Sequence, residues 1–591
     1  MNSDRPSSQS PAAPERKTSG SETTVPKGEV PHVNTAPFAR LANWMAPALI
    51  LLTPLVGFLV YHHYDVLRAE TLSCAGLFIL IGLAISAFIE LRPGLLRPAV
   101  IALLLILFLD LHLRSAEQAW LAQFVRWDLA WAHKLMVLTA GLLIIALVLM
   151  TVTWMIRQHL GTIVSSIFGV VVLTSLLLPF ERPQIGETYS KDTVKQADLP
   201  PVLHLVLDGQ ISLDGLPNDI PGAHDLRREL TAFYRGFGFT VFGSSFSHYR
   251  STAESLSNLL NGQAASRARV NIATSGTRFA QRGIRLRDNL WFRQLSDRGY
   301  RIWVYQTDYI DFCAPEQFNV DYCFTAPSNS IRSVMDTDLS LSTKIRIILN
   351  TYLSGSMAFR IVAKAAAAKT AGFDFLGKPM RWLWRTRKLG AFSAASVLDR
   401  IARDLRAAPQ GTAFFAHVMI PHGSYVLDAD CGIRSEIDTW LGSLSSKPPF
   451  VNTPASRATR YKLYFDQVRC THRKLASIFR TMAAAGIFEK ATIIVHGDHG
   501  SRIALTVPTF QMTHTVSTTD LTDSYATLFA MRAPEPPARS DHRLQSIQGL
   551  FAEFVLKQPL VAETTDIFIL PPGFPKAGSA LMRIPMPEFG D

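Results

Sequence analysis

Cysteine is scarce in this sequence, with five residues in 591 and no C-x-x-C pair. The absence of such a pair argues against a zinc site built from cysteines. The first 40 residues lack an apolar core followed by a small-residue cleavage site, so we expect no cleaved signal peptide. No internal repeat is evident, and a repeat architecture is therefore not expected.

Apolar residues are concentrated in one part of the chain, and the mean hydropathy of +0.16 indicates that this part lies in lipid. Residues 1–40 are rich in Ser, Pro, Thr and Lys without an apolar period, which predicts a disordered tail. Residues 41–180 are predicted to form a transmembrane domain, because they contain five apolar stretches near the roughly 20 residues that cross a bilayer. These stretches are 44–61, 71–89, 95–111, 135–156 and 161–180.

The basic residues predict the orientation of these five helices. The tail carries five basic residues, and the loops predicted on the same side of the membrane carry Arg92, Arg97 and Arg157. The first loop on the opposite side has only Arg68. The second opposite loop has three basic residues, which weakens the bias without reversing it. The tail is therefore predicted to be cytoplasmic, and an odd number of spans places the rest of the chain outside.

The second outer loop carries three tryptophans at helical spacing, Trp120, Trp127 and Trp131. Tryptophan is favoured at the boundary between lipid and water. The segment near 114–133 is therefore predicted to be an amphipathic helix at the outer interface. An ordinary connecting loop is the alternative.

The cysteines agree with an oxidising compartment for the region after the spans. Cys74 lies inside the second apolar stretch and is expected to be a small packing residue. The other four follow the membrane part, and their even number suggests two disulfides. Cys313 with Cys323 is the local pairing, and Cys431 with Cys470 would then tie a loop to a helix.

After a Pro-marked linker, 181–200, strand and helix patterns alternate through residues 201–591. This alternation predicts an extracytoplasmic α/β domain with a mainly parallel sheet between two layers of helices. The predicted strands are 202–207, 239–242, 301–305, 412–419 and 491–495. The predicted helices are 226–235, 252–260, 290–297, 457–485 and 543–556. The basic, Ala-rich segment 327–410 is taken as an insertion.

Polar residues follow two of the predicted strands at the point where each strand ends. The strand 491–495 leads into Asp498 and His499 between glycines, and the strand 202–207 leads into Asp208-Gly209. A carboxylate and an imidazole at strand ends are suitable metal ligands, and ligands of such sheets collect beyond these ends. Each motif taken alone could equally be a surface turn.

Thr252 opens a predicted helix directly after Ser251. Hydroxyl residues are common at this position because they cap helices, and capping alone would explain the pattern. The same geometry also favours an anion beside the hydroxyl, through the helix dipole and free amide groups. A nearby metal would lower the pKa of that hydroxyl and make it a nucleophile.

Two further histidines lie in polar segments after strands. His422 follows the strand 412–419 in Pro-His-Gly-Ser-Tyr, and His514 lies in the loop that follows Asp498-His499. Neutral imidazole binds metals and its charged form contacts phosphate. Isolated histidines are more often structural or exposed. Arg502 follows shortly after Asp498-His499. It could contact a phosphate group or be an ordinary surface arginine.

The ordered set of Asp208, Thr252, Pro-His422-x-x-Tyr425, Asp498-His499-Gly and His514 resembles the alkaline phosphatase superfamily. More narrowly it resembles the membrane-bound phosphoethanolamine and phosphoglycerol transferases, which include lipoteichoic acid synthases. Those bacterial proteins have five spans and an extracytoplasmic α/β domain, so the resemblance covers the chain from about residue 44 onward.

The resemblance implies that Asp208, Thr252, Asp498 and His499 hold a divalent metal, zinc or manganese with magnesium also compatible. It implies that Thr252 is the nucleophile and that His422 and His514 contact substrate phosphate or a second metal. Three positions depart from the family. Asp208 stands where many members have Glu, and Ser255-Leu-Ser-Asn stands in place of Ser-x-Pro-Cys. Ser501-Arg502 replaces an acidic residue. The sulfatase pattern C/S-x-P-x-R is missing around Thr252, which disfavours sulfate hydrolysis.

We therefore expect an inner-membrane enzyme with its catalytic domain in the periplasm. It would move phosphoglycerol or phosphoethanolamine from a membrane phospholipid to a glycan or glycolipid through phospho-Thr252. The net charge of +12 would attract anionic lipids or acidic glycans. The chain is expected to act as a monomer, without nucleic acid. The alternatives are a phosphodiesterase, phosphatase or sulfatase-like hydrolase that uses water, and a non-catalytic scaffold or transporter subunit.

Overall fold

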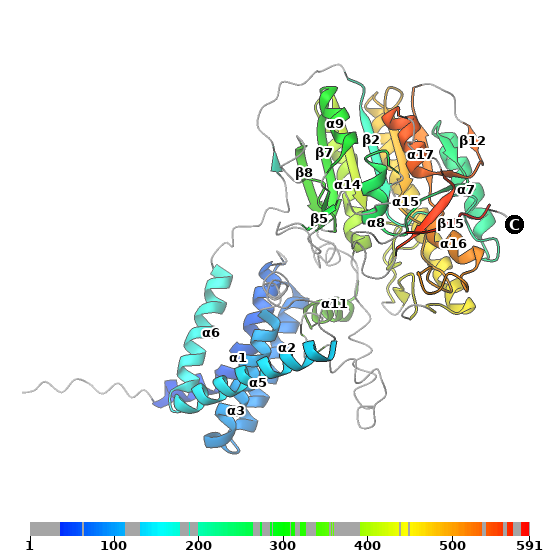
Figure 1. The fold of residues 1–591 in the computed structure, drawn as a ribbon. Helices are drawn as coiled ribbons and strands as arrows, with labels where there is room; N and C mark the ends of the chain where they lie inside the picture. Colours follow the sequence, from blue (N-terminus) through cyan, green and yellow to red (C-terminus); the bar gives the residue numbers. More distant parts are fainter. Residues whose placement is uncertain are drawn as a thin grey trace, which may run out of the picture.

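The computed structural model describes most of the chain, and the structural statements below concern these residues (Figure 1). The described residues are 36–61, 64–112, 131–177, 188–189, 199–263, 272–274, 284–286, 288–307, 309–313, 320–326, 339–353, 356, 359, 390–436, 439–446, 450–534, 539–558, 564–570 and 581–589.

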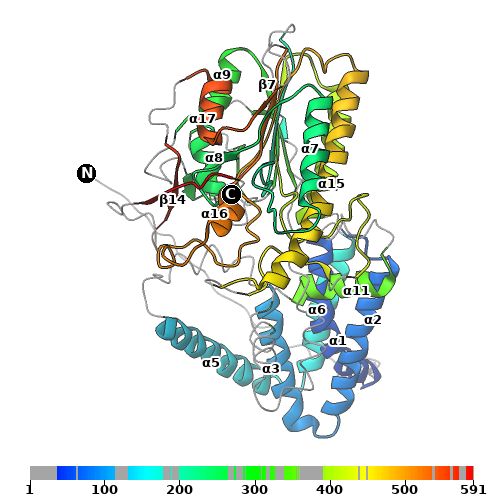
Figure 2. The same ribbon diagram turned by 90° about the vertical axis from the view of Figure 1, so that its right-hand side faces the viewer.

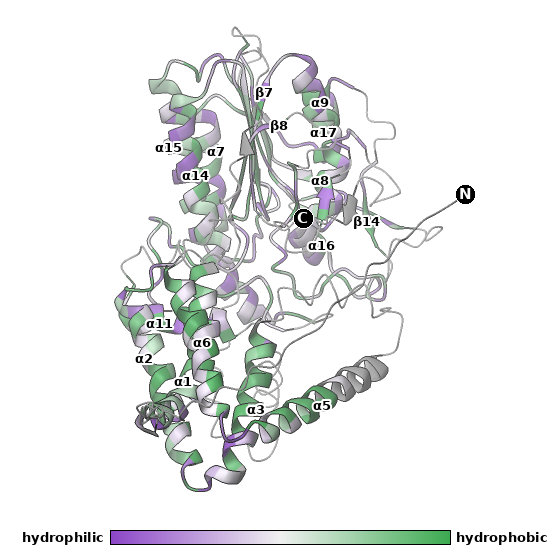
Figure 3. Ribbon diagram, turned by 90° about the vertical axis from the view of Figure 1, so that its left-hand side faces the viewer, coloured by the Kyte–Doolittle hydropathy of each residue, from purple (hydrophilic) through white to green (hydrophobic). Residues whose placement is uncertain are grey.

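The N-terminal part is helical, with one helix over each apolar stretch of the sequence. These are α1 (Ala36–Tyr61), α2 (Ala69–Ile89), α3 (Pro93–His112), α5 (Trp131–Met155) and α6 (Leu160–Leu177). Within the described residues, α1, α2 and α6 are long and apolar enough to cross a membrane. Crossing by α3 and α5 stays a prediction. Figure 3 shows the apolar character of these helices in green.

Helix α1 packs against both α2 and α6. The contact with α2 is close because Gly82 has no side chain; a Cβ there would lie 2.3 Å from the Cα of Ala48. Hydroxyl groups add bonds between the helices, since Ser86 and Ser165 donate to the carbonyls of Trp44 and Ala42 at 2.7 and 2.6 Å. Small residues and hydroxyls at such contacts are typical of helices that pack in lipid.

The C-terminal part is built on a nine-stranded sheet, in the order β1-β8-β7-β9-β2-β10-β11-β3-β12. The strands from β8 to β10 are parallel, β11 runs antiparallel to β10 and β3, and β1 is an antiparallel edge. In sheet order their bounds are Thr188–Tyr189, Val320–Ala326, Arg301–Thr307, Thr412–Val418, Val202–Leu207, Thr492–Gly497, Phe529–Arg532, Thr240–Phe242 and Ser540–Asp541. The prediction of a mainly parallel sheet is confirmed.

Helices cover both faces of this sheet, as Figure 2 shows. One layer contains α7 (Ala223–Gly236), α14 (Gly390–Ala407) and α15 (Pro454–Ala484). The other contains α8 (Thr252–Leu259), α9 (Leu290–Asp297), α17 (Ile547–Phe551) and a π-helical turn, Ala552–Leu556. Residues of β2 alternate between the layers, with Leu203 and Leu205 in one core and Val202 and Val206 in the other. Alternate side chains of β2 are therefore buried against opposite layers of helices.

Shorter elements complete the domain. Helix α16 (Thr518–Tyr525) follows the Asp498-His499 loop. Three two-stranded sheets lie outside the main one. Their strands are β4 (Ser245–Phe246) with β13 (Gln545–Ser546), β5 (Ile272–Thr274) with β6 (Ile284–Leu286), and β14 (Asp566–Ile569) with β15 (Met582–Pro585).

The two parts of the chain meet through helix α11 (Leu341–Leu353), which packs against α2. The ring of Tyr352 lies 5.5 Å from that of Phe58 in α1 and 5.8 Å from that of Phe78 in α2. A second contact joins α3 to the later chain, where the Ser356 hydroxyl donates to the carboxylate of Asp110. The α/β part therefore rests on the helix ends that the charge pattern places outside.

Several predicted boundaries differ from the structure. The segment 327–410, predicted as an insertion, contains α11 and α14, and α14 packs with α15 beside the central strands, so α14 belongs to the core. Helix α1 begins at Ala36, within the predicted tail. The linker 181–200 contributes strand β1. The predicted interfacial helix near 114–133 falls almost entirely outside the described residues.

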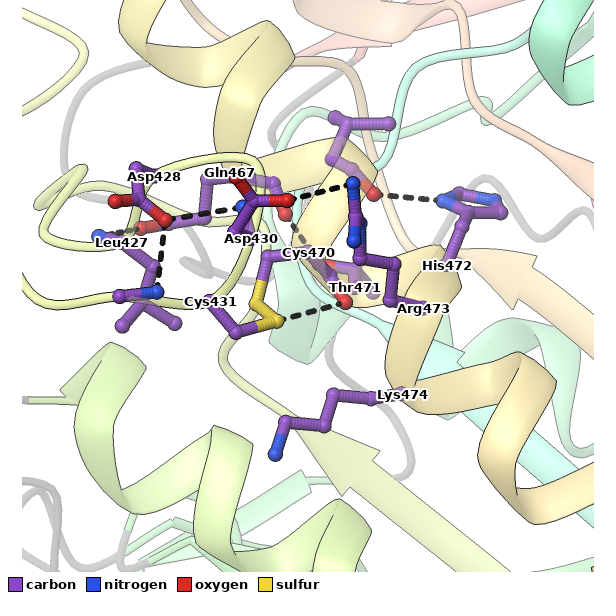
Figure 4. The surroundings of a disulfide bond; sticks show 12 residues. Leu427, Asp428, Asp430, Cys431, Gln467, Cys470, Thr471, His472, Arg473 and Lys474 are labelled. Atoms are coloured by element: carbon purple, nitrogen blue, oxygen red, sulfur yellow. Dashed lines mark hydrogen bonds and ion pairs between the residues drawn. A yellow bond between two sulfur atoms is a disulfide. The ribbon is translucent and has the colours of Figure 1, made fainter.

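Both predicted disulfides are confirmed. Cys313 is bonded to Cys323, with Cα atoms 6.2 Å apart, and Cys431 is bonded to Cys470, with Cα atoms 4.9 Å apart. Figure 4 shows the second bond, which joins the segment after His422 to helix α15. Cys74 is buried and free, as expected.

Candidate active site

Three neighbouring parallel strands end at one edge of the sheet, and the candidate residues follow them. In the ladder Leu207 of β2 pairs with Val418 of β9 on one side and with Gly497 of β10 on the other. Because the strands run in the same direction, Asp208, the segment around His422 and the Asp498-His499 pair emerge side by side. The ends of parallel strands are where α/β proteins place their ligands.

The predicted metal ligands meet around the Nε2 atom of His499. This atom lies 3.3 Å from Oδ1 of Asp208 and 3.3 Å from Oδ2 of Asp498. The ligand atoms of these three residues all lie within 4.8 Å of one another, and all three side chains are buried. Residues almost 300 positions apart along the chain thus form one compact group.

The backbone around Asp498 leaves one of its oxygens available. Oδ1 accepts the amide N–H groups of Gly209 at 2.9 Å and His499 at 3.0 Å. Gly209 adopts a φ of +74°, a conformation that glycine tolerates best. Gly500 must also be small, because a Cβ would lie 2.5 Å from the carbonyl oxygen of Asp523. Oδ2 of Asp498 therefore faces the cluster.

The donor set fits a divalent cation. Oδ1 of Asp208 and Oδ2 of Asp498 are buried without a hydrogen-bond partner, which is costly for a carboxylate unless a cation offsets it. Nδ1 of His499 lies 2.8 Å from the carbonyl of Gly500 and can donate to it, leaving the lone pair of Nε2 directed at the carboxylates. Two carboxylate oxygens and an imidazole nitrogen suit zinc or manganese.

Thr252 lies beside His499 of this group, at the first position of helix α8. Its side chain is buried, and Oγ1 is 3.5 Å from Nε2 of His499. Ser251 precedes the helix in an extended conformation, and its hydroxyl donates to the carboxylate of Glu254. The first amide groups of a helix have no partner within it, so they are available to an anion beside Thr252.

Histidines surround the carboxylate of Asp208. Nε2 of His417 is 3.6 Å from Oδ2, and Nε2 of His422 is 4.0 Å from Oδ1. Burial alone would raise the pKa of Asp208. The imidazoles of His422, and then of His417 and His499, outweigh burial and hold the pKa of Asp208 well below its ordinary value. Asp208 is therefore a carboxylate across the physiological range.

The segment that carries His422 is held by a glutamine of α15. The side-chain amide of Gln467 donates to the carbonyls of Pro421 at 3.1 Å and His422 at 3.0 Å, and its oxygen accepts the N–H of Val426 at 2.9 Å. Three residues further along α15, Cys470 ties the same segment by its disulfide to Cys431 (Figure 4). Helix α15 thus holds the loop that carries His422 through both Gln467 and Cys470.

Sequence reasoning missed His417 as a site residue. It lies at the end of β9, is fully buried, and neither ring nitrogen has a hydrogen-bond partner. Its position within an apolar strand was the available signal, because a polar side chain in a buried strand requires an explanation.

A buried ion pair beneath the Asp498-His499 loop was also missed. Asp523 in α16 accepts from Nε of Arg457 at 2.9 Å and Nη2 at 3.1 Å, and from the hydroxyl of Tyr461. Its backbone carbonyl accepts the N–H of Arg502 at 2.7 Å, and Tyr461 contacts Ser501 at 2.8 Å. Only the folded chain brings α15 and α16 together here.

The two remaining predicted residues lie differently. Arg502 has a φ of +60°, and its Nε is buried without a hydrogen-bond partner. His514 is exposed in a turn, and among the described residues no hydrogen bond or ion pair joins it to the cluster. The contact of either residue with substrate stays a prediction.

Neither a protein-family model nor a curated protein sequence matches the chain. Solved structures do show similarity. The C-terminal periplasmic domain of EcEptC from Escherichia coli, in complex with zinc, is 13% identical over 67% of this chain and 96% of that one, with a TM-score of 0.37. The phosphonate monoester hydrolase of Agrobacterium radiobacter is 13% identical over 63% of this chain and 80% of that one, with a TM-score of 0.34.

A Bacteroides thetaiotaomicron protein of glycosaminoglycan metabolism is 14% identical over 63% of this chain and 80% of that one, with a TM-score of 0.35. Because the identities and TM-scores are low, the functional assignment below rests on the geometry of this chain.

Proposed function

We propose that the protein is a metal-dependent transferase that moves a phospho-head-group from a membrane phospholipid to a glycan or glycolipid. The observation that carries this proposal is the position of the Thr252 hydroxyl, 3.5 Å from Nε2 of His499, which belongs to the buried group of Asp208, Asp498 and His499. A divalent cation held by those three residues would supply positive charge that lowers the pKa of the hydroxyl and stabilises a phosphoryl oxygen.

The reaction is a double displacement. Thr252 Oγ1 forms a bond to phosphorus while the bond from phosphorus to the diacylglycerol oxygen breaks, and the hydroxyl proton passes, net, to diacylglycerol. An acceptor hydroxyl then attacks phosphorus and releases Thr252, which recovers a proton from the acceptor. The helix start at Thr252 is suited to hold the phosphoryl group between the two steps.

The membrane part supports a lipid donor. Within the described residues, three apolar helices are long enough to cross a bilayer, and α11 packs the catalytic part against α2. We propose five spans in the bacterial inner membrane, with the α/β domain in the periplasm. Anchoring would keep the site near its donor and raise the effective donor concentration.

The test uses the purified full chain in detergent with manganese or zinc and head-group-labelled phosphatidylglycerol or phosphatidylethanolamine. We expect diacylglycerol release and label bound at Thr252. Thr252→Ala should remove both, whereas Thr231→Ala, which removes a hydroxyl from the unrelated helix α7, should not. Unchanged turnover in Thr252→Ala would exclude this nucleophile. Rapid release of the label into water without any acceptor would identify a hydrolase instead.

A further inference from the structure

A cavity of about 230 Å³ lies next to the start of α8. Its wall contains Arg250, Ser251 and Glu254, which flank Thr252 in the sequence. Its opposite walls contain aromatic side chains from separate parts of the chain, which include Phe510, Tyr525 and Phe568. The cavity is below the ~300–1,000 Å³ of drug-sized ligand sites, so it suits one small ligand.

The cavity adjoins the metal cluster without containing it. Asp208, Asp498, His499 and Thr252 are not part of its wall, whereas three residues within two positions of Thr252 are: Arg250, Ser251 and Glu254. A ligand in the cavity would therefore lie beside the phosphoryl group on Thr252, in the place that a second substrate needs.

Arg250 brings a positive charge into this wall without a partner of its own. Among the described residues, no hydrogen bond or ion pair joins its half-buried side chain to another group. Nε of Arg502 is also buried without a hydrogen-bond partner. A half-buried guanidinium without a partner carries a desolvation cost that a bound anion would offset.

The same wall also contains a carboxylate, that of Glu254. Glu254 accepts the hydroxyl of Ser251, and no ion pair joins it to Arg250 in the part of the chain that the structure describes. Guanidinium groups bind phosphate and carboxylate with two parallel hydrogen bonds, so Arg250 is suited to a ligand that carries such a group.

We propose that this cavity is the acceptor subsite and that it selects an acceptor bearing a negatively charged group, a phosphate or carboxylate on a sugar-sized molecule. This proposal rests on the transferase function proposed above. Aromatic walls would contact the apolar face of the sugar, Arg250 would bind its anionic group, and a free hydroxyl would be directed toward phospho-Thr252.

The first experiment measures binding and needs no turnover. The full chain in detergent, without lipid donor, is titrated calorimetrically with glucose 1-phosphate, glucose or inorganic phosphate. We expect glucose 1-phosphate to bind more tightly than either of the others, and Arg250→Gln to weaken it at least tenfold. Arg403→Gln, which removes an exposed arginine from α14, should have no effect.

Two results of the titration would overturn the proposal. Equal binding of glucose and glucose 1-phosphate would show that the charge is not recognised. Inorganic phosphate that binds as tightly as glucose 1-phosphate, with the same dependence on Arg250, would show a phosphate site and no acceptor subsite.

The second experiment separates the half-reactions. Arg250→Gln should form phospho-Thr252 from labelled lipid at the normal rate and require at least tenfold more glucose 1-phosphate to discharge it. A slower formation of phospho-Thr252 would assign Arg250 to the donor and overturn the acceptor subsite. If the wild type never labels Thr252, the transferase itself fails, and the titration then shows by itself whether the cavity binds an anionic sugar.

Discussion

The hydroxyl of Thr252 and Nε2 of His499 lie 3.5 Å apart although 247 residues separate them in the chain. Neither residue is distinctive alone, because threonine is common at the start of a helix and histidine is common in turns. Their contact, beside two buried carboxylates, is what makes the threonine a candidate nucleophile.

Asp498 should be needed to retain the metal. Its Oδ2 is one of two buried carboxylate oxygens without a hydrogen-bond partner in the cluster. We expect Asp498→Ala to weaken metal binding by more than about a hundredfold, since even residues behind the ligands contribute roughly 10–100-fold. Metal content after purification and dialysis, measured by mass spectrometry, tests this. Asp399→Ala, which removes a surface partner of Lys474, is the control. Full metal retention in Asp498→Ala would exclude the site.

His422 and His514 should differ in their effect on turnover. Nε2 of His422 is 4.0 Å from Asp208, and its loop is fixed by Gln467, whereas His514 is exposed. We expect His422→Asn to lower kcat/KM about a hundredfold, within the range for groups that exchange protons or contact charge in the transition state. His514→Asn should lower it much less. If the two variants lose kcat/KM equally in a steady-state assay, His514 contacts the substrate, as the sequence motif predicts.

Much of the sheet could be predicted because its strands are buried and punctuated by turns. Strand β2 and helix α9 have the predicted bounds. Asp208, Asp498 and His499 lie together because they follow the neighbouring parallel strands β2 and β10, and Thr252 joins them from the start of α8. The strand-end pattern made Asp208 and Asp498 candidates, and the ordered set of motifs made them predicted ligands. The helix α14 was missed although Leu398, Ile401 and Leu405 follow a helical period, because the surrounding Ala-rich segment was taken as a whole.

Contacts between distant side chains could not be predicted in this way. The pair of Asp523 and Arg457 depends on the packing of α15 against α16, and neither residue belongs to a motif. Arg250 gave a stronger signal, since it lies two residues before Thr252, but only the fold places it in the wall of a cavity. Local patterns therefore predict the ligands, whereas the supporting residues need the structure.

The stability of the protein should depend on pH through Asp523. Burial raises the pKa of this carboxyl to about 6, although Arg457 opposes the shift, while an unfolded Asp titrates near ~3.9. The pKa of Asp523 is higher in the folded state than in the unfolded state, so protonation of this carboxyl stabilises the fold. This stabilisation is complete below pH ~3.9 and is lost as the pH rises to about 6. On lowering the pH from 7 to 4, the wild type should gain on the order of 3 kcal/mol relative to Asp523→Asn.

Thermal unfolding of both proteins across this pH range is the measurement. Asp219→Asn is the matched control, because Asp219 contacts the same arginine from an exposed position. A Tm difference between wild type and Asp523→Asn that does not change with pH would contradict the shifted pKa of Asp523.

The orientation of the membrane helices can be tested with single cysteines in a Cys74→Ala background. Leu67 precedes α2, Arg92 lies between α2 and α3, and His159 precedes α6, and all three are exposed. We expect a membrane-impermeant maleimide to label Leu67→Cys in intact spheroplasts, and to label Arg92→Cys and His159→Cys only after lysis. Labelling of all three in intact cells would contradict the five-span topology.

The disulfide of Cys431 and Cys470 should stabilise the protein more than that of Cys313 and Cys323. Its cysteines are 39 residues apart, against 10 for the other pair, and a longer loop loses more entropy when it is closed in the unfolded chain. On this model the two bonds contribute about 4 and 3 kcal/mol. Removing Cys431 and Cys470 also frees the segment that holds His422, so kcat/KM should fall together with Tm. The double variants Cys431→Ser/Cys470→Ser and Cys313→Ser/Cys323→Ser are compared by thermal unfolding and turnover, with Cys74→Ala as the control for loss of a buried thiol. If only the shorter bond affects turnover, the segment around His422 is held by Gln467 alone.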